Sequence, residues 1–160
     1  MQQTQQTDSV EKVRKWLHEA GFPVEIRMTE ATIFTVEDAS MAVGVPPSEI
    51  LKSILLLADE RPVLALMSGP NKVDLKKVKR HLNARKVRMC DPDFVFAYSG
   101  FRIGGVPPVG YPEQPFALLD EELFQFPVVW AAAGSDHAFF PISPEELRRI
   151  TGGEARDIKK

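Results

Sequence analysis

The chain has 160 residues, a formal net charge of −2 and 44% hydrophobic residues, values that are ordinary for one globular domain. This composition excludes a disordered chain, a collagen-like repeat and a coiled coil. A single cysteine, Cys90, excludes an internal disulfide and a cysteine-based metal cluster. The N-terminus lacks the basic and apolar regions of a signal peptide, and apolar runs such as 54–58 are too short to cross a bilayer. We therefore expect a cytoplasmic protein.

Residues that favour helix caps and glycines that end helices divide the first half of the chain into short elements. In chain order we expect a flexible tail at 1–7, a helix that begins at Asp8 or Ser9 and ends at Gly21, a strand at 24–28, a helix at 36–43, a hairpin of strands 51–57 and 63–67, and a helix from Asp74 to about residue 82.

The second half is interrupted by a segment rich in glycine and proline, 104–110, which is incompatible with a regular helix or strand. The elements expected here are a strand at 86–90, a short helix from Asp91 to Tyr98, strands at 116–119 and 128–133 around a helical turn at 120–124, a strand at 138–140, and a helix that Ser143 caps and that runs to about residue 151.

Strands and helices follow one another without a regular strand–helix–strand alternation, and there is no internal repeat. This order predicts an α+β fold, in which helices surround a curved, barrel-like sheet that is mixed but largely antiparallel. No long linker divides the chain, so we expect one domain over 1–160, with 158–160 as a second flexible tail.

Lys52 begins a strand that is apolar on both faces and is therefore expected to be buried in the centre of a sheet. A lysine in that place must reach a cavity, a carboxylate or solvent. It is either a cation directed into a ligand cleft or a lysine that extends along the strand end to water.

The loop 104–110 offers a second candidate feature. Paired glycines allow a ligand to approach the backbone, and the N–H groups of Gly104, Gly105 and Val106 would form a cradle for an anion, because Pro107 and Pro108 donate no hydrogen bond. A rigid surface turn explains the same residues equally well.

Ser135, Asp136 and His137 lie between an apolar strand and the last helix. His137 is a candidate general acid or base, with a structural or exposed histidine as the alternative. Adjacent residues of an extended segment point to opposite faces, so an Asp136–His137 pair is not expected unless the chain turns there. Cys90 has no base near it in sequence, so it is a weak candidate nucleophile. His18 and His81 are assigned no role, and no metal-ligand spacing is present.

Positive charge is concentrated in one segment. Residues 72–88 carry a local net charge of +7, whereas the rest of the chain carries −9. Such a segment is either a phosphate-binding surface or a solvated helix face. Its basic residues are Lys72, Lys76, Lys77, Lys79, Arg80, Arg85, Lys86 and Arg88.

Taken together, four stretches resemble the YbaK/EbsC family of aminoacyl-tRNA editing domains, which includes free-standing deacylases and the insertion domain of bacterial prolyl-tRNA synthetases. The stretches follow the family's order over about residues 10–157, and the lysine followed by the Gly-Gly-x-x-Pro loop is their most specific part. They are the residues from Thr35 to Ser53, 72–77, 99–110 and 133–147.

The resemblance implies a small curved-sheet domain that hydrolyses the ester between a wrong amino acid and the 3′-terminal ribose of tRNA. It implies that Lys52 is essential and that Gly104–Pro108 lines the pocket and offers N–H groups to the substrate. It assigns catalytic positions to Lys52, Gly104, Gly105 and His137, and substrate contacts to Thr35, Val106, Pro108, Ser135 and Asp136.

Family members that act on cysteinyl-tRNA carry a tyrosine where Arg27 or Met28 stands here, so the resemblance favours alanine or another small amino acid. The expected partners are mischarged aminoacyl-tRNA and a cognate synthetase, without membrane, DNA, cofactor or metal. The residues expected on the tRNA backbone are Lys72, Lys76, Lys77, Arg80 and Lys86, and the alternative function is a non-catalytic RNA-binding module that uses the same surface.

Overall fold

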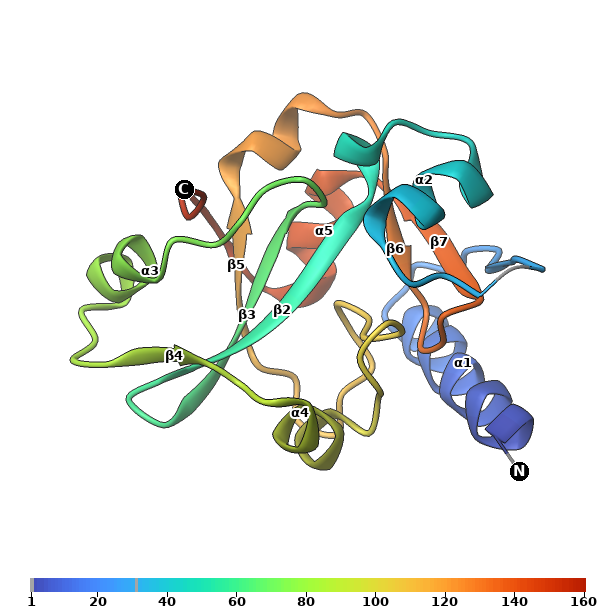
Figure 1. The fold of residues 1–160 in the computed structure, drawn as a ribbon, viewed down its shortest axis with the longest axis horizontal. Helices are drawn as coiled ribbons and strands as arrows, with labels where there is room; N and C mark the ends of the chain where they lie inside the picture. The colour runs from blue at the N-terminus through green and yellow to red at the C-terminus, as the bar shows by residue number, and fades with distance from the viewer. Residues whose placement is uncertain (1, 31) are drawn as a thin grey trace.

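A computed structural model describes residues 2–30 and 32–160 of the chain (Figure 1). The helices in these residues are α1 (Gln2–Glu19), α2 (Val36–Val43), η1 (Pro47–Glu49), α3 (Leu75–Leu82), α4 (Pro92–Ser99), η2 (Glu121–Gln125) and α5 (Pro144–Thr151). The strands are β1 (Arg27–Met28), β2 (Leu51–Ala58), β3 (Arg61–Ser68), β4 (Val87–Met89), β5 (Phe116–Asp120), β6 (Val129–Ala132), β7 (Ala138–Ile142) and β8 (Glu154–Arg156).

The strands form two sheets. The larger sheet has the order β4-β2-β3-β5-β8, antiparallel between β4, β2 and β3 and parallel from β3 to β8, and the smaller sheet has the order β1-β7-β6. The α+β class and the mixed character of the sheet are therefore confirmed.

The barrel-like closure is wrong, because among the described residues only a parallel bridge between Ile50 and Trp130 joins the two sheets. A closed barrel requires a continuous ladder of paired strands.

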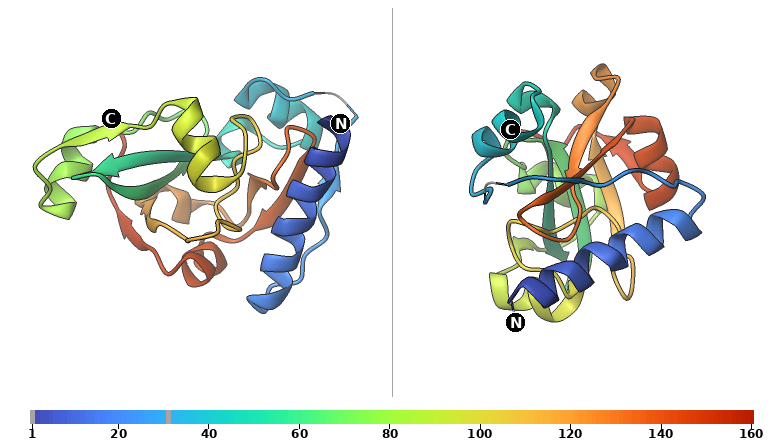
Figure 2. Two further views of the ribbon diagram at one scale, coloured as in Figure 1. Left: turned by 90° about the horizontal axis from the view of Figure 1, so that it is seen from below. Right: turned by 90° about the vertical axis from the view of Figure 1, so that its right-hand side faces the viewer.

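The two faces of the larger sheet contribute to different cores, as the alternation of side chains along a strand requires. Leu51 and Leu55 of β2 pack in the larger core with residues of α1, α4 and α5. Leu56, on the opposite face, packs with Val78 of α3 and with Ile158. Figures 1 and 2 show the consequence: α3 and α1 lie at opposite ends of the molecule, with the sheets between them.

The C-terminal residues are held against the start of α3, in contrast to the flexible tail expected at 158–160. The Ile158 side chain is fully buried, and its carbonyl accepts a hydrogen bond from the Asp74 N–H at 2.7 Å. The N–H of Lys160 donates to the Lys72 carbonyl at 2.9 Å. The Ile158 side chain packs in the core beneath α3, and the free energy gained by its burial holds the neighbouring polar residues in place.

Helix α1 begins at Gln2, so residues 2–7 are helical and the expected cap at Asp8 or Ser9 lies inside the helix. Glutamine is a good helix former, and the four glutamines of residues 2–6 allow the helix to extend beyond the cap signal.

Candidate active site

Strand β2 is paired along only part of its outer edge. Strand β4 pairs with residues 56–58, and the Cys90 N–H donates to the Leu55 carbonyl at 3.2 Å. Between Leu55 and the bridge at Ile50, no described strand covers this edge, and a cavity of about 360 Å³ opens there. Its other walls are the start of α2, the loop at residues 103–106 and the ends of β6 and β7.

Four of the residues expected at the site line this first cavity. They come from three separate parts of the chain and are Thr35, Lys52, Gly104 and Val106. The fold therefore brings the lysine and the glycine loop together, as the sequence predicts. Apolar side chains make much of the remaining wall, among them Ile33, Ala39 and Phe139.

Lys52 is half-buried, and its ammonium donates a hydrogen bond to the Asn71 carbonyl. The Asn71 side chain in turn donates to the Glu122 carboxylate, which also pairs with Lys159 at 3.2 Å. Burial, together with the nearby ammonium of Lys72, lowers the pKa of Lys52 from its usual value of 10.5. The site thus holds a cation that is partly desolvated and that has no carboxylate as a direct partner among the described residues.

The glycine loop has less free donor capacity than expected. The N–H of Gly105 donates to the Arg102 carbonyl at 3.0 Å, so it is already used inside the loop. Gly104 and Val106 both line the first cavity, and their N–H groups have no hydrogen-bond partner among the described residues. Two amides, rather than three, remain for a ligand.

Glycine is required at both positions of the pair for different reasons. Gly104 has a φ of +101°, a conformation that other residues rarely adopt. A Cβ on Gly105 would lie 2.6 Å from the Cα of Ser135, so this residue packs directly against the neighbouring loop. Pro108 is buried and outside the cavity, and its carbonyl accepts a hydrogen bond from Gln114 at 2.8 Å.

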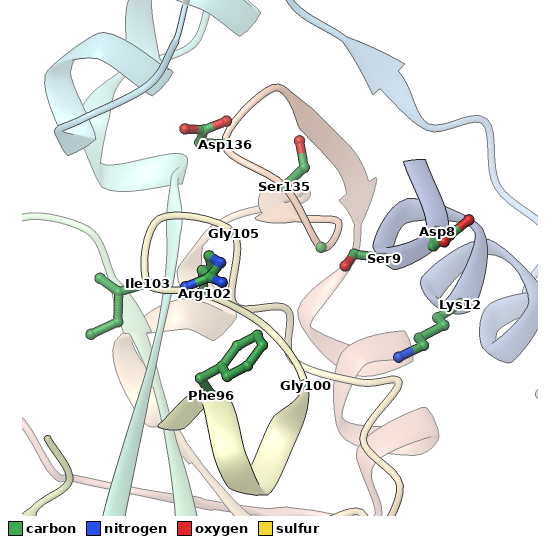
Figure 3. Close-up of a pocket in the computed structure, with 11 residues that line it drawn as sticks. Asp8, Ser9, Lys12, Phe96, Gly100, Arg102, Ile103, Gly105, Ser135 and Asp136 are labelled. Carbon is green, nitrogen blue, oxygen red and sulfur yellow. The ribbon is translucent and has the colours of Figure 1, made fainter. Parts of the chain in front are cut away.

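A second cavity, of about 500 Å³, lies on the other side of the glycine loop (Figure 3). Gly105, Ser135 and Asp136 line this cavity and not the first one. Ile103 lines both cavities and separates them.

His137 lines neither cavity. Its Nδ1 lies 2.6 Å from an Asp136 carboxylate oxygen, and its Nε2 lies 3.1 Å from the Thr32 hydroxyl. The pairing with Asp136 corrects the expectation from an extended segment, because the chain turns here and the Ser135 hydroxyl accepts a hydrogen bond from the His137 N–H. These contacts hold the ring in place outside both cavities, and a role for His137 in proton transfer stays a prediction.

Cys90 lines the first cavity, but burial raises the pKa of its thiol to about 11. A thiol with this pKa is protonated at neutral pH and is a poor nucleophile. Within the described residues, no three His, Cys, Asp or Glu side chains are placed to hold a metal ion, and no helix is long and apolar enough to cross a membrane.

The basic face of α3 differs from the expected set at one position. Lys76 and Arg80 are exposed, but the ammonium of Lys77 contacts both Asp157 carboxylate oxygens at 2.9 and 3.0 Å and the Lys159 carbonyl at 2.8 Å. Lys77 is therefore an internal ion-pair partner, and the exposed Lys79 stands beside Lys76 and Arg80 instead. Lys72 and Lys86 are also exposed.

Sequence reasoning missed the residues that hold Lys52 and several residues of the second cavity. Asn71 and Glu122 hold Lys52 through contacts between distant segments, which no local pattern indicates. Arg102 lines the second cavity and lies inside a stretch that resembles the family, so the sequence offered a reason to consider it. Phe96 also lines that cavity, but nothing in the sequence distinguishes it from other apolar residues of a short helix.

A family model described as the aminoacyl-tRNA editing domain matches residues 30–150 of this chain, a range that contains Lys52 and the whole glycine loop. The chain belongs to the aminoacyl-tRNA editing domain family. The resemblance to the YbaK/EbsC type is thereby confirmed.

Two curated relatives cover most of this editing domain. YwhH of Bacillus subtilis (strain 168), an uncharacterized protein, is 32% identical over 144 residues, which are 89% of this chain and 91% of YwhH. The "Putative Cys-tRNA(Pro)/Cys-tRNA(Cys) deacylase EbsC" of Enterococcus faecalis is 26% identical over 125 residues, 78% of this chain and 76% of EbsC. The proline–tRNA ligase of Lactiplantibacillus plantarum is 29% identical over 112 residues, but the match spans only 20% of that enzyme.

Solved structures share the fold of this editing domain over nearly its full length. The crystal structure of "a putative trans-editing enzyme for prolyl tRNA synthetase" matches with a TM-score of 0.90 and 37% identity over 95% of this chain and 97% of the other. The hypothetical protein APE2540 matches with a TM-score of 0.87 and 26% identity, over 93% of this chain and 99% of the other.

Proposed function

We propose that this editing domain is a free-standing deacylase, which hydrolyses the ester between a wrong amino acid and the 3′-terminal ribose of tRNA. The observation that carries the proposal is one cavity lined both by Lys52 and by Gly104 and Val106, whose N–H groups have no partner among the described residues. An ester hydrolase needs donors and positive charge where the carbonyl oxygen becomes negative, and this cavity offers both. The printed names of EbsC and of the trans-editing structure support the same reaction.

In the proposed reaction, a water molecule attacks the carbonyl carbon of the ester. The carbonyl oxygen meanwhile accepts hydrogen bonds from the backbone N–H groups of Gly104 and Val106. Lys52 stabilises the negative charge on that oxygen. The tetrahedral species then collapses, the carbon–oxygen bond to the ribose breaks, and the proton lost by the water is passed to the departing ribose oxygen. The vicinal ribose hydroxyl orients the water, because the cavity contains no carboxylate and no histidine among its described lining residues.

We propose a small, apolar amino acid such as alanine as the preferred acyl group. Ile33, Ala39 and Phe139 give the cavity apolar walls, which favour a short aliphatic side chain. The positions that correspond to the tyrosine of cysteine-specific members lie away from this cavity: Arg27 donates to the Val43 carbonyl at 3.1 Å, and Met28 is exposed.

The proposed substrate implies a cytoplasmic location and a functional connection with an aminoacyl-tRNA synthetase. The match to part of proline–tRNA ligases supports a prolyl-tRNA synthetase as the source of the mischarged tRNA. The exposed cations Lys72, Lys76, Arg80 and Lys86 are proposed to contact the tRNA backbone.

The test is deacylation of alanyl-, seryl-, threonyl- and cysteinyl-tRNA by the purified chain, with Lys52→Met measured in parallel. The expected result is release of the amino acid from one or more of these tRNAs, fastest for alanine, and loss of release in the variant. Absence of turnover with every ester, together with salt-sensitive tRNA binding, would instead support the RNA-binding module suggested by the basic residues of α3.

A further inference from the structure

The second cavity is enclosed by closely packed backbone segments. Four segments meet around it: α1, α4, the loop at 100–105 and the turn at 134–136. A Cβ on Gly134 would lie 2.7 Å from the Ser9 carbonyl oxygen, and a Cβ on Gly105 would be equally close to Ser135. The backbones therefore approach one another as closely as glycine permits, and they fix the shape of the cavity.

Two cationic side chains line this cavity without a direct ion-pair partner among the described residues. Lys12 from α1 and Arg102 from the loop line it, and neither forms an ion pair or a side-chain hydrogen bond with a described residue. Two carboxylates, those of Asp8 and Asp136, also line the cavity, and that of Asp136 contacts the His137 ring. Figure 3 shows the Lys12 ammonium directed toward the cavity and the carboxylate of Asp8 turned away from it.

The same cavity offers a flat surface. The guanidinium of Arg102 lies 4.5 Å from the centre of the Phe96 ring, and 42% of Phe96 is exposed. Cations combined with an exposed aromatic ring are the combination by which proteins hold single-stranded nucleic acid, since the cations contact phosphates and the flat groups stack on bases.

We propose that the second cavity binds the nucleotide that precedes the terminal adenosine, with its phosphate between Lys12 and Arg102 and its base on the Arg102–Phe96 surface. This inference rests on the proposed function, which places the aminoacyl end in the first cavity. Ile103 forms a wall of both cavities, and 62% of it is exposed, so an RNA strand that leaves the first cavity across Ile103 enters the second.

The test compares the binding of the dinucleotide 5′-phosphocytidylyl-(3′→5′)-adenosine, which carries the phosphate proposed to lie between Lys12 and Arg102, with that of adenosine 5′-monophosphate, measured by calorimetric titration at pH 7. The wild-type chain is expected to bind the dinucleotide at least about tenfold more tightly, the usual contribution of one stacked base. Lys12→Ala/Arg102→Gln and, separately, Phe96→Leu are expected to bring this ratio close to one. Arg61→Gln, which removes an exposed cation from the tip of the β2–β3 hairpin, is the matched control and is expected to keep the wild-type ratio.

Equal affinity of the wild-type chain for the two probes overturns the inference, as does a tenfold preference that survives in both variants. The same preparations are then tested on aminoacyl esters of adenosine and of the dinucleotide. Failure of the proposed function has a different signature, because the dinucleotide preference and its loss in the variants then remain while neither ester is hydrolysed. Hydrolysis of both esters with equal kcat/KM leaves the proposed function intact and contradicts the second cavity as a nucleotide site.

Discussion

Lys52 is costly to keep where it stands. Its ammonium is partly removed from water and lies near the like charge of Lys72. Among the described residues it contacts the Asn71 carbonyl oxygen and no carboxylate, so its desolvation is only partly compensated. A group held in this way lowers the stability of the unliganded fold, and such groups are typical of functional sites, where the charge serves a ligand. The substrate oxyanion is the ligand we propose for it.

Lys52→Met is therefore expected to separate activity from stability. Deacylation of the preferred tRNA should fall by about 10²–10³ in kcat, the usual effect of removing one stabiliser of an oxyanion, while KM changes little. The urea concentration at the unfolding midpoint should stay the same or rise, because the variant no longer buries a charge. Lys15→Met, on the exposed face of α1, is the matched control. A variant with wild-type kcat would remove Lys52 from the mechanism.

The lowered pKa of Lys52 also predicts a dependence on pH. The protonated form is available only below the folded-state pKa, which lies under 10.5, so affinity for a non-hydrolysable aminoacyl-adenosine amide should decline before pH 10.5. Lys72→Met should move this decline to higher pH, because it removes the neighbouring cation. Between the folded-state pKa and 10.5, the unfolded chain binds more protons at this site, so its contribution to the free energy of unfolding increases with pH. A pH profile unchanged by Lys72→Met would contradict the assignment.

Cys90 provides a test of the alternative chemistry. Because the pKa of its thiol is raised to about 11, the thiol is neutral at pH 7 and is expected to react with iodoacetamide far more slowly than a free cysteine. Cys90→Ser should retain deacylation within about threefold of wild type, since the substitution keeps the size of the side chain nearly constant. Loss of activity in this variant, with its fold intact by circular dichroism, would indicate a cysteine nucleophile.

At the scale of elements, the contact between α3 and the C-terminal residues supports the network that holds Lys52. Ile158 packs beneath α3 with Val78 and Leu56, and Lys159 pairs with the same Glu122 that binds Asn71. Ile158→Ala is expected to lower the free energy of unfolding by about 2–4 kcal/mol, the cost of a buried isoleucine and its cavity. Lys160→Ala is the control, because it keeps the hydrogen bond from the backbone N–H of residue 160 to the Lys72 carbonyl. The free energy of unfolding of both variants is measured by urea denaturation. A loss below about 0.5 kcal/mol for Ile158→Ala would mean that this contact is peripheral.

The elements that the sequence predicts well carry their signals locally. Thr35 and Gly44 bound α2, Asp74 caps α3, and Ser143 caps α5, each through a hydrogen bond or turn made within a few residues. Strand β8 was missed because Glu154–Arg156 is polar and owes its conformation to parallel pairing with β5.

The same distinction applies to the site. Lys52 and the glycine loop are visible in sequence, since a charge in an apolar strand and paired glycines are local anomalies. The ion pair of Lys77 with Asp157 joins residues 80 positions apart, and the use of the Gly105 N–H depends on the fold of its loop, so neither follows from spacing. The Asp136–His137 contact required knowledge of a turn that the extended-strand pattern conceals.

Over the whole molecule, positive charge flanks the first cavity on two sides. Lys72 lies next to Lys52 and leads to the exposed cations of α3, whereas Lys12 and Arg102 lie beyond Ile103 toward α1. Figure 1 places α3 and α1 at opposite ends of the molecule. In our proposal the two cavities bind the single-stranded 3′ end of the tRNA. The double-stranded acceptor stem lies outside them, so we expect its phosphates to contact a larger basic surface.

We expect that surface to be the exposed face of α3, formed by Lys76, Lys79 and Arg80. The reversal Lys76→Glu/Lys79→Glu/Arg80→Glu should weaken tRNA binding and make the plot of log K against log salt less steep by up to about three, one for each phosphate that the protein no longer neutralises. The loss of affinity should be much larger for full-length tRNA than for an aminoacyl-adenosine ester, which is too short to reach α3. Lys77→Ala is the matched control: it breaks the pair with Asp157 and is expected to lower stability without changing the salt slope. An unchanged slope in the triple variant, combined with a shallower slope in Lys12→Glu/Arg102→Glu, would place the acceptor stem on the α1 side and leave the face of α3 as a solvated surface.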